Sequence, residues 1–490
     1  MTDVCLVLEG TYPYVSGGVS TWIHQLVSGM PTLRFSILYV SAYPNHRREY
    51  KYKVPSNVVE IEDCYLHDYS PSTQTSSRKR RVAAFERLVD VHDRLLAGRW
   101  EAFDDLLPDL RDPASALTFA DLFESEESWD TLTTFYTRFG ENASFLDFFW
   151  TWRSIYLPLF KTLRCPIPRA RVYHSVSTGY AGILAATAKA TMDCSMLLTE
   201  HGVYTHERLL EISQATWIYS PHRDRFRVQR ELSFFKRFWL GFFHAMGCVA
   251  YRAADRIITL FEGNRTKQML AGAPSAKISI IPNGIDLDAF RDIASAGERP
   301  PRQTVAFVGR VVPIKDVKTF LHAAKIILDA QAGVDFLVLG PTDEEPEYHS
   351  ECKELAQTLG LESQVRFLGR VDMREHYPNI DVVVLTSLSE AQPYVLLEAN
   401  AAGIPVVATD VGACREMLEG RLPEDRRLGA SGLLTSVSRP EDTAAAVLRL
   451  LRDARLRASM AQAGRARTLR FYDQLDLISQ YSNIYEQMMR

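Results

Sequence analysis

Two glutamates eight residues apart, Glu390 and Glu398, form the pattern in this chain that most directly suggests chemistry. They follow an apolar run at residues 382–386 that is typical of a buried strand, and Pro393 between them suits the first position of a helix. A helix N-terminus offers free backbone N–H groups and partial positive charge, which favour a phosphate group. Carboxylates on either side of that phosphate can accept hydrogen bonds from sugar hydroxyls. The pattern therefore indicates a site for a nucleotide diphosphate that carries a sugar at each end.

A second pattern supplies positive charge for the same ligand. Arg310 and Lys315 follow the apolar run at residues 304–308. Arginine can hold phosphate oxygens with two parallel N–H donors, and lysine adds a compact charge. Open α/β sheets bind ligands at the carboxyl ends of their strands, so we expect both cations to face the diphosphate. Three backbone N–H groups at the helix start would complete the phosphate site, those of Tyr394, Val395 and Leu396.

The first half of the chain contributes two weaker signals. Gly17 and Gly18 follow the first apolar run, where paired glycines let backbone approach a ligand, although a plain tight turn explains them equally well. His201 follows another strand-like run and could hydrogen-bond a sugar hydroxyl or the charge that develops during reaction. A purely structural histidine is the alternative interpretation.

A turn sequence, Asn283-Gly284, marks a crossing between the two halves. Asp286 and Asp288 just after it match a short DxD pattern that some metal-dependent enzymes use. Two nearby acids are common by chance, and His206 and Glu207 lack an evident third ligand. We therefore expect neither a bound metal nor another cofactor.

Apolar runs alternate with helix-like segments along most of the chain, which predicts parallel sheets covered by helices. Two such sets predict two doubly wound α/β domains that face a cleft. The predicted strands are residues 4–8, 35–40, 172–175, 196–199, 257–260 and 278–281 in the first half, and 304–308, 336–339, 365–368, 382–386 and 406–409 in the second.

The polar, proline-containing segment 292–303 predicts the linker, which gives domains at residues 1–290 and 291–470. Residues from about 68 to 168 interrupt the alternation and predict a helical insertion in the first domain. The basic run at residues 78–81 inside it is expected to be a solvated loop, with contact to a partner or anionic lipid as the alternative. Residues 471–490 are helix-like.

Composition excludes several classes of protein. The chain has 490 residues, enough for two or three domains with real cores, and a net charge of −4 that argues against a general nucleic-acid binder. Seven scattered cysteines without CxxC spacing, and a start that lacks a signal peptide's pattern, predict a cytoplasmic protein with reduced thiols. The apolar run 238–251 is shorter than the roughly 20 residues of a membrane span, so we expect a buried helix, with membrane or partner docking as the alternative. Signatures of P-loop, GxSxG, HExxH and GxGxxG proteins are absent from the sequence.

Taken together, the Arg310 and Lys315 motif, residues 282–286 and the Glu390-x7-Glu398 pair resemble the retaining glycosyltransferases of family four, which have a GT-B fold. The N-terminal residues 6–22 and residues 199–208 are similar to the group in that family that serves bacterial Pel exopolysaccharide synthesis. The helical insertion also fits that group.

The resemblance implies a UDP-sugar donor and an α-linked product. It assigns Arg310 and Lys315 to the diphosphate, Glu398 to the ribose, Glu390 to the donor sugar and Arg370 to the base. From the first domain, Gly17 and Gly18 would line the phosphate and His201 would lie near the reacting carbon. Residues 471–490 would return to the first domain and complete it.

For the Pel-type group the resemblance implies a polymer rich in N-acetylgalactosamine, and docking to an inner-membrane polysaccharide synthase complex. It favours a UDP-N-acetylhexosamine donor and leaves UDP-glucose open. We hypothesise front-face retention, because the site offers positive charge but no obvious nucleophile. A sugar-nucleotide epimerase, a starch- or sucrose-type transferase and a non-catalytic UDP-sugar sensor are the other interpretations.

Overall fold

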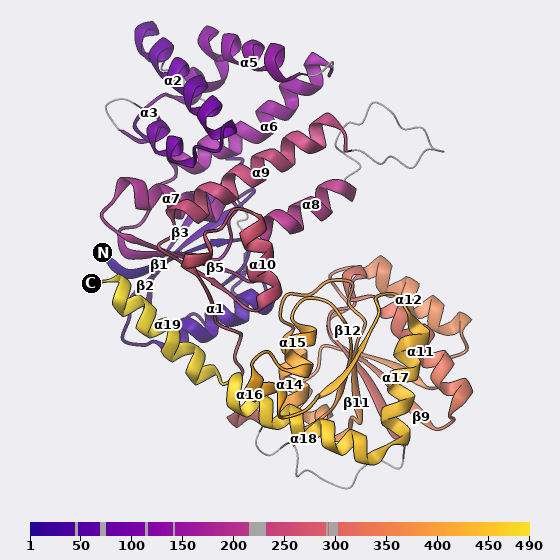
Figure 1. Ribbon diagram of the computed structural model, residues 1–490. Coiled ribbons are helices and arrows are strands. Elements are labelled where there is room, and N and C mark those ends of the chain that lie inside the picture. Colours follow the sequence, from indigo (N-terminus) through magenta and orange to yellow (C-terminus); the bar gives the residue numbers. More distant parts are fainter. Residues whose placement is uncertain are drawn as a thin grey trace. The chain divides into compact units, whose positions relative to one another are not determined.

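The computed structural model describes residues 1–44, 48–68, 75–112, 116–140, 143–214, 232–290, 293 and 302–490 (Figure 1). The chain divides into two compact units. Unit 1 contains residues 1–259, 265–280 and 481–490, and unit 2 contains residues 260–264 and 281–480. Most of the predicted linker, residues 292–303, lies outside the described residues.

Unit 2 takes in residues 281–290 and 471–480, which the sequence predicts as parts of the first domain. Backbone pairing between these two segments explains the difference. The Ile285 N–H donates to the Tyr472 carbonyl at 2.9 Å, and the Gln474 N–H donates to the Ile285 carbonyl at 3.0 Å. The two segments therefore hold each other in the same unit.

Unit 1 is built on a seven-stranded parallel sheet in the order β3-β2-β1-β4-β5-β6-β7. Residues 4–8 of β1 are fully buried, as expected for a strand covered on both faces. The order reverses direction between β1 and β4, which makes this pair the topological switch point. The strands are β1 (Thr2–Glu9), β2 (Phe35–Ser41), β3 (Val58–Tyr65), β4 (Ala170–Ser175), β5 (Ser195–Glu200), β6 (Arg256–Thr259) and β7 (Ile278–Ile280).

Helices cover this sheet, and α7 packs on β1, β4 and β5. The helices are α1 (Gly18–Gly29), α7 (Tyr180–Thr191), α8 (Tyr204–Gln214), α9 (Phe234–Ala253), α10 (Glu262–Leu270) and α19 (Gln474–Met488), with a 3₁₀ turn η2 (Ser275–Lys277). The aromatic run at residues 238–251 lies inside α9, which buries Phe243 and Met246. Among the helices in the described ranges, none combines the length and apolar character that a bilayer crossing requires.

Residues between β3 and β4 form a helical insertion, seen in purple in Figure 1. Its helices share one apolar core with the sheet, and α6 packs against both α7 and α9. The elements are α2 (Arg78–Leu96), η1 (Trp100–Leu106), α3 (Leu107–Arg111), α4 (Phe119–Glu124), α5 (Glu126–Phe139) and α6 (Phe145–Arg164).

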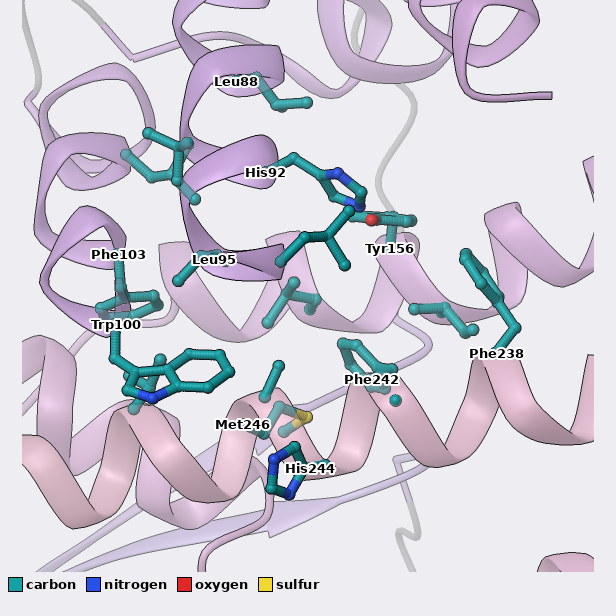
Figure 2. A pocket seen from close by; sticks show the side chains of 18 of the residues that line it. Leu88, His92, Leu95, Trp100, Phe103, Tyr156, Phe238, Phe242, His244 and Met246 are labelled. Carbon is teal, nitrogen blue, oxygen red and sulfur yellow. The ribbon is translucent and has the colours of Figure 1, made fainter. Parts of the chain in front are cut away.

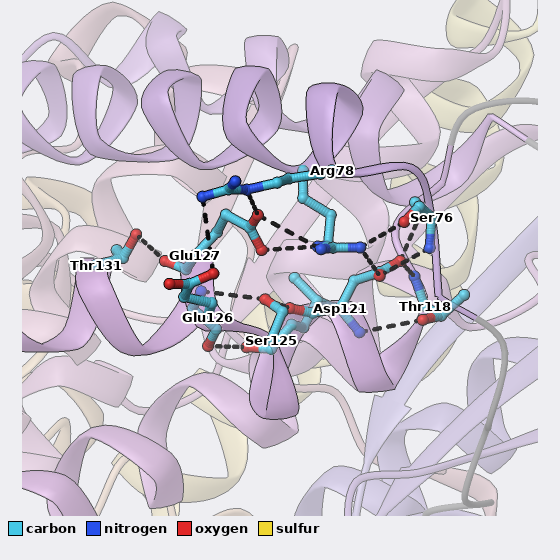
Figure 3. Close-up of polar contacts among 11 residues, drawn as sticks. Ser76, Arg78, Thr118, Asp121, Ser125, Glu126, Glu127 and Thr131 are labelled. Carbon is cyan, nitrogen blue, oxygen red and sulfur yellow. Dashed lines mark hydrogen bonds and ion pairs between the residues drawn. The ribbon is translucent and has the colours of Figure 1, made fainter.

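The basic run at residues 78–81 is the first turn of α2, so the expectation of a solvated loop is wrong. Arg81 Nε donates to Glu127 at 2.7 Å, and Arg78 lies 3.7 Å from Glu126 and 3.6 Å from Glu127 (Figure 3). Two acids at the start of α5 thus neutralise part of the run and join α2 to α5. The sequence does not show this pairing, because the partners are more than 40 residues apart.

Unit 2 is built on a six-stranded parallel sheet in the order β10-β9-β8-β11-β12-β13. Side chains of β8 alternate between two cores: Val305 and Phe307 enter one, and Ala306 and Val308 enter the other. The switch point lies between β8 and β11. The strands are β8 (Gln303–Val308), β9 (Val334–Leu339), β10 (Val365–Gly369), β11 (Val382–Leu385), β12 (Val406–Thr409) and β13 (Gly432–Thr435).

Helices cover both faces of this second sheet, as the two cores require. They are α11 (Val317–Ala330), α12 (Pro346–Thr358), α13 (Met373–His376), α14 (Tyr394–Ala401), α15 (Cys414–Glu419), α16 (Pro423–Arg426), α17 (Pro440–Arg452) and α18 (Ala454–Phe471), with 3₁₀ turns η3 (Asp288–Phe290), η5 (Pro313–Lys315) and η6 (Tyr377–Asn379).

Candidate functional site

The loops after β8 and β11 flank the switch point of unit 2, and hydrogen bonds join them. Thr386 Oγ1 donates to the carbonyls of Lys315 and Asp316 at 3.1 and 2.8 Å. The Leu388 N–H donates to the Ile314 carbonyl at 2.8 Å. The two loops that carry the predicted cations and carboxylate therefore form one connected structure at the place where open α/β sheets bind ligands.

Lys315 and Glu390 meet directly in this structure. Lys315 Nζ lies 2.5 Å from Glu390 Oε1, and their side chains are only 17% and 10% exposed. Ser387 Oγ donates to the same carboxylate oxygen at 2.7 Å. The sequence assigns the two residues to different parts of the donor, whereas the structure makes them one charge-paired unit.

Gly412 fits against the backbone of the Glu390 loop. Its φ of +55° lies in the left-handed region, and a Cβ there would overlap the carbonyl oxygens of Glu390 and Ala391. The next residue, Ala413, donates its N–H to the Ala391 carbonyl at 2.8 Å. The loop position of Glu390 therefore depends on a glycine more than twenty residues further along the chain.

Helix α14 begins at Tyr394, with Pro393 as the preceding cap residue, one position later than predicted. The Leu396 N–H already donates to the Pro393 carbonyl at 3.2 Å, and its side chain is fully buried. The Leu396 amide thus has a backbone partner in this structure, and its assignment to a phosphate stays a prediction. Tyr394 and Val395 are half-buried in the first turn, where the helix N-terminus carries partial positive charge.

Glu398 lies on α14, and one of its two carboxylate oxygens accepts a hydrogen bond from a described residue. Tyr377 Oη donates to Glu398 Oε2 at 2.8 Å. Within the part of the chain that the structure describes, Oε1 receives no hydrogen bond. Burial raises the pKa of this carboxyl above its usual range, and the Tyr377 bond partly offsets that rise. Glu398 thus offers one free acceptor in a partly dehydrated setting.

The Asn283 turn attaches to the loop between the two glutamates. The Asn283 N–H donates to Gln392 Oε1 at 2.6 Å, and Nδ2 lies 3.4 Å from the Gln392 carbonyl. Asp286 Oδ1 accepts from the Asp288 N–H at 3.0 Å, which is a local turn bond. The described residues contain no group of three or more His, Cys, Asp or Glu side chains placed to hold a metal.

Arg310 and Arg370 are exposed, and Arg310 forms its ion pair with Glu344 rather than with Glu390. Arg310 Nη1 lies 2.6 Å from Glu344, and both side chains are more than 40% exposed. Arg370 follows β10, an edge strand two positions from β8, and it is exposed. Arg310 can exchange Glu344 for a phosphate at small cost, because exposed ion pairs are weak.

Unit 1 holds His201 in an apolar setting at the end of β5. The histidine is 7% exposed, and its ring lies 4.8 Å from the Trp22 ring at 74°. Burial lowers its pKa to about 4, so the imidazole is neutral at pH 7. It can exchange hydrogen bonds with a hydroxyl but does not carry a charge.

Gly17 and Gly18 are exposed at the start of α1. Gly17 has φ 167°, which is extended backbone open to any residue, and a Cβ there would meet nothing within 4 Å. Packing within the described residues therefore does not demand glycine at residue 17. The position leaves space beside the helix start, where a ligand could approach.

Sequence reasoning missed two carboxylates that end strands of unit 1: Glu200 is fully buried and Glu9 is half-buried. Glu200 accepts from Tyr251 Oη at 2.6 Å, Gln268 Nε2 at 2.8 Å and Thr178 Oγ1 at 3.1 Å. Glu9 ends β1 and accepts from Tyr204 Oη at 3.3 Å. Burial raises the pKa of both carboxyls. A glutamate as the last residue of an otherwise apolar strand was the available signal for each.

Two parallel α/β units with these strand orders define a GT-B glycosyltransferase fold, and solved structures share it. Sucrose-phosphate synthase from Thermosynechococcus elongatus matches with a TM-score of 0.59 and 17% identity, over 99% of this chain and 98% of that chain. HepE of Anabaena, in complex with UDP and glucose, matches with a TM-score of 0.60 and 14% identity, over 99% and 100%. At these identities the likeness concerns the fold.

Family comparison places each half of the chain. The chain belongs to the family described as Domain of unknown function (DUF3492), whose model matches residues 2–276. Residues 302–453 match the model of Glycosyl transferases group 1, so unit 2 carries a group 1 glycosyltransferase domain.

Curated relatives match less than half of the chain. D-inositol 3-phosphate glycosyltransferase of Actinosynnema mirum is 34% identical over 224 residues, which are 42% of this chain and 52% of that protein. The Mycobacterium marinum protein of the same name is 35% identical over 214 residues, 41% and 42% of the two chains. The chain spans about half the length of the curated relatives it matches.

Proposed function

We propose that this protein is a retaining glycosyltransferase that moves a sugar from a UDP-sugar to a growing exopolysaccharide. The observation that carries the proposal is the Lys315–Glu390 pair at the switch point of unit 2. The second glutamate, Glu398, lies on helix α14, which follows the Glu390 loop. The group 1 glycosyltransferase match over residues 302–453 supports it independently. HepE, whose structure was solved in complex with UDP and glucose, supports a UDP-sugar as the donor class.

Each residue then has a chemical task. Lys315 and Arg310 neutralise the diphosphate, and Glu390 orients Lys315 while it accepts from a donor-sugar hydroxyl. The free Oε1 of Glu398 accepts from a ribose hydroxyl. Preorganised positive charge at the departing anion lowers the barrier directly, and losing one such contact costs about 2–4 kcal/mol, or roughly 30- to 1,000-fold in rate.

The proposed reaction proceeds on one face of the sugar. The bond between the anomeric carbon and the diphosphate oxygen breaks, and the acceptor hydroxyl oxygen forms the new bond from the same side. A phosphate oxygen of the departing UDP takes the hydroxyl proton. His201, neutral at pH 7, is available to hydrogen-bond near the reacting carbon. The mechanism requires neither a metal nor a cofactor, so turnover should survive excess EDTA.

The identity of the acceptor is a more specific proposal, and it rests on resemblance to a known glycosyltransferase. Residues 6–22 and 199–208 resemble PelF, the glycosyltransferase of Pel exopolysaccharide synthesis. We therefore favour a UDP-N-acetylhexosamine donor with UDP-glucose second, a Pel-type acceptor, and docking to an inner-membrane polysaccharide synthase complex on the cytoplasmic side.

The test combines binding with turnover. Thermal-shift titration with UDP, UDP-glucose, UDP-N-acetylglucosamine and UDP-N-acetylgalactosamine should reveal the donor, since a ligand at about 100 times its Kd stabilises by ~2.7 kcal/mol. Absence of a shift with every UDP compound would sink the assignment. A transferase releases UDP as sugar is transferred or hydrolysed, whereas an epimerase interconverts UDP-sugars without acceptor.

A further inference from the structure

The helical insertion and α9 enclose a pocket of about 620 Å³ in unit 1 (Figure 2). Helices α2 and α6 and the 3₁₀ turn η1 form its walls together with α9. None of the candidate donor-site residues lines it. Ligand pockets in proteins typically have volumes of about 300–1,000 Å³, so this one is large enough to hold a molecule.

The floor of the pocket is apolar and deeply buried. Protein interiors contain few voids larger than a water molecule, and apolar cavities that do exist tend to stay dry and to bind apolar ligands. In Figure 2, Trp100 from η1 and Phe242 and Met246 from α9 turn toward the space. The floor residues, each at most 2% exposed, include Val91, Ile155, Leu163, Ile183 and Val249.

Apart from two arginines, few polar residues line the pocket. His92 and Tyr156 lie close to each other in Figure 2. Burial lowers the pKa of His92 to about 4, so its ring is uncharged at pH 7. A ligand in the pocket therefore meets a largely apolar interior. The His92 ring there is uncharged, and its buried Nδ1 has no hydrogen-bond partner among the described residues.

The charged residues of the lining are both arginines, Arg138 at the end of α5 and Arg237 on α9, and both are exposed. Arg138 Nη1 lies 3.0 Å from Asp93, and Arg237 Nη1 donates to the Leu232 carbonyl at 2.8 Å. The lining as described contains no carboxylate. Positive charge at the rim of an apolar interior complements a molecule with a hydrocarbon tail and a negative head.

The volume of the pocket is that of a small-molecule site, so we assign it to a small ligand rather than to a protein helix. A single hydrocarbon chain is thin enough to follow the pocket to its floor.

We propose that this pocket binds one hydrocarbon chain of an anionic amphiphile, whose carboxylate or phosphate head contacts Arg138 and Arg237. A free fatty acid and a membrane lipid share this chemistry, and the experiment distinguishes the two sources. The site is independent of the proposed glycosyl transfer, since it lies among different residues.

Substitution of Gly241 can obstruct the pocket. It lines the space from α9, and a Cβ there would meet nothing within 4 Å. Gly241→Phe places an aromatic ring at this lining position to obstruct the pocket, while Gly241→Ala adds only the Cβ and leaves the space open. A second pair of substitutions, Arg138→Gln with Arg237→Gln, tests the head group at exposed positions that do not endanger folding.

The probes are oleate, oleyl alcohol, and phosphatidylcholine vesicles with and without phosphatidylglycerol. We expect saturable one-to-one binding of oleate by calorimetry, at least tenfold weaker in Gly241→Phe and unchanged in Gly241→Ala. The double arginine variant should weaken oleate but not oleyl alcohol. Binding of oleate in solution identifies a free fatty acid as sufficient, and recruitment only to phosphatidylglycerol vesicles identifies a membrane lipid.

Two results would overturn the proposal. One is the absence of binding to both oleate and phosphatidylglycerol vesicles. The other is binding that Gly241→Phe leaves unchanged while its far-ultraviolet circular dichroism and melting temperature match the wild type, since the ligand would then lie elsewhere.

Discussion

Lys315 Nζ and Glu390 Oε1 lie 2.5 Å apart at the switch point of unit 2, in a pair whose side chains are mostly buried. This contact changes how the two residues are understood. A lysine held by a carboxylate is already positioned before a diphosphate arrives, and the carboxylate is partly neutralised. The pair therefore acts as one preorganised group rather than as two separate contacts to the ligand.

Substitution of either member should therefore cost a similar amount of activity. We expect Lys315→Met and Glu390→Gln each to lower kcat/KM by roughly 30- to 1,000-fold, and the double variant to be within about threefold of the worse single one, because residues that act as a unit are not additive. Steady-state kinetics of UDP release measure this. Lys325→Ala removes a lysine from an exposed pair with Asp329 in the same unit and should stay within twofold of wild type. Losses that multiply in the double variant would contradict the idea.

Glu398 should control UDP affinity more than turnover, because its free oxygen is assigned to the ribose. Glu398→Gln should weaken UDP binding by about tenfold with a smaller change in kcat, in contrast to Glu390→Gln. Tyr377→Phe removes the hydrogen bond to Glu398 Oε2 and should weaken UDP binding less, because the carboxylate oxygen assigned to the ribose remains. Calorimetric titration with UDP provides the numbers. Equal loss of UDP affinity in the Glu390 and Glu398 variants, with turnover kept, would refute this division.

Acidification should weaken UDP binding at a higher pH than an ordinary glutamate would allow. Burial raises the pKa of Glu398, and the ionised form is the better acceptor. As the pH falls through this raised pKa, the carboxyl gains a proton and UDP affinity declines. Glu398→Gln should remove this component of the pH dependence, and titrations between pH 8 and pH 5 would show it. A variant with the same pH profile as the wild type would assign the effect to another group.

Gly412 should matter to catalysis although it bears no side chain. In Gly412→Ala the added methyl overlaps the backbone of Glu390 and Ala391, so the loop must move and kcat should fall by about tenfold or more. Gly360→Ala is the matched control, because Gly360 also has positive φ (+67°) but a Cβ there meets nothing within 4 Å. Both should lose about 1–2 kcal/mol of stability from left-handed backbone, and only the first should lose activity. Equal kinetics in the two variants would disprove the positioning role.

Unit 1 should lose stability on mild acidification. Burial lowers the pKa of His174 to about 3 and that of His201 to about 4, against about 6.5 in an unfolded chain. Between the lowered pKa and 6.5, the unfolded state binds more protons than the folded state. Each histidine therefore lowers the free energy of unfolding by up to about 1.4 kcal/mol for every pH unit below 6.5. Urea unfolding at pH 7.5 and pH 5.5 tests this. The raised pKa of Glu9 and Glu200 acts in the opposite direction, so the informative comparison is with His174→Gln, whose stability should vary less with pH.

The sequence was sufficient to predict the interior of both sheets and one edge strand of each, and it missed the other edge strand. All eleven predicted strands exist. Most are apolar runs buried on both faces, although the edge strands β7 and β10 are partly exposed. The two that were missed, β3 and β13, are edge strands. β3 carries Glu60, Glu62 and Asp63. An edge strand with one solvent-exposed face need not be continuously apolar, so its sequence lacks the pattern of a buried strand.

The candidate site was predictable as a set of residues but not as a set of contacts. Motif spacing placed Lys315 and Glu390 on loops at the ends of neighbouring strands, which the sheet order then brings together. Contacts such as Tyr377 to Glu398 and Asn283 to Gln392 depend on how loops fold through space, and no periodicity encodes them.

Helix α19 has a consequence for the order in which the protein is made. His174 Nδ1 lies 2.6 Å from Tyr485 Oη, and Tyr481 packs on Trp22 at 5.3 Å between ring centroids. Residues 481–490 thus supply buried parts of a unit whose other segments are translated long before. A ribosome must finish nearly all of unit 2 before unit 1 can close its core. Unit 1 should therefore resist proteolysis in the nascent chain only after unit 2 has been made, although β1 is translated before unit 2.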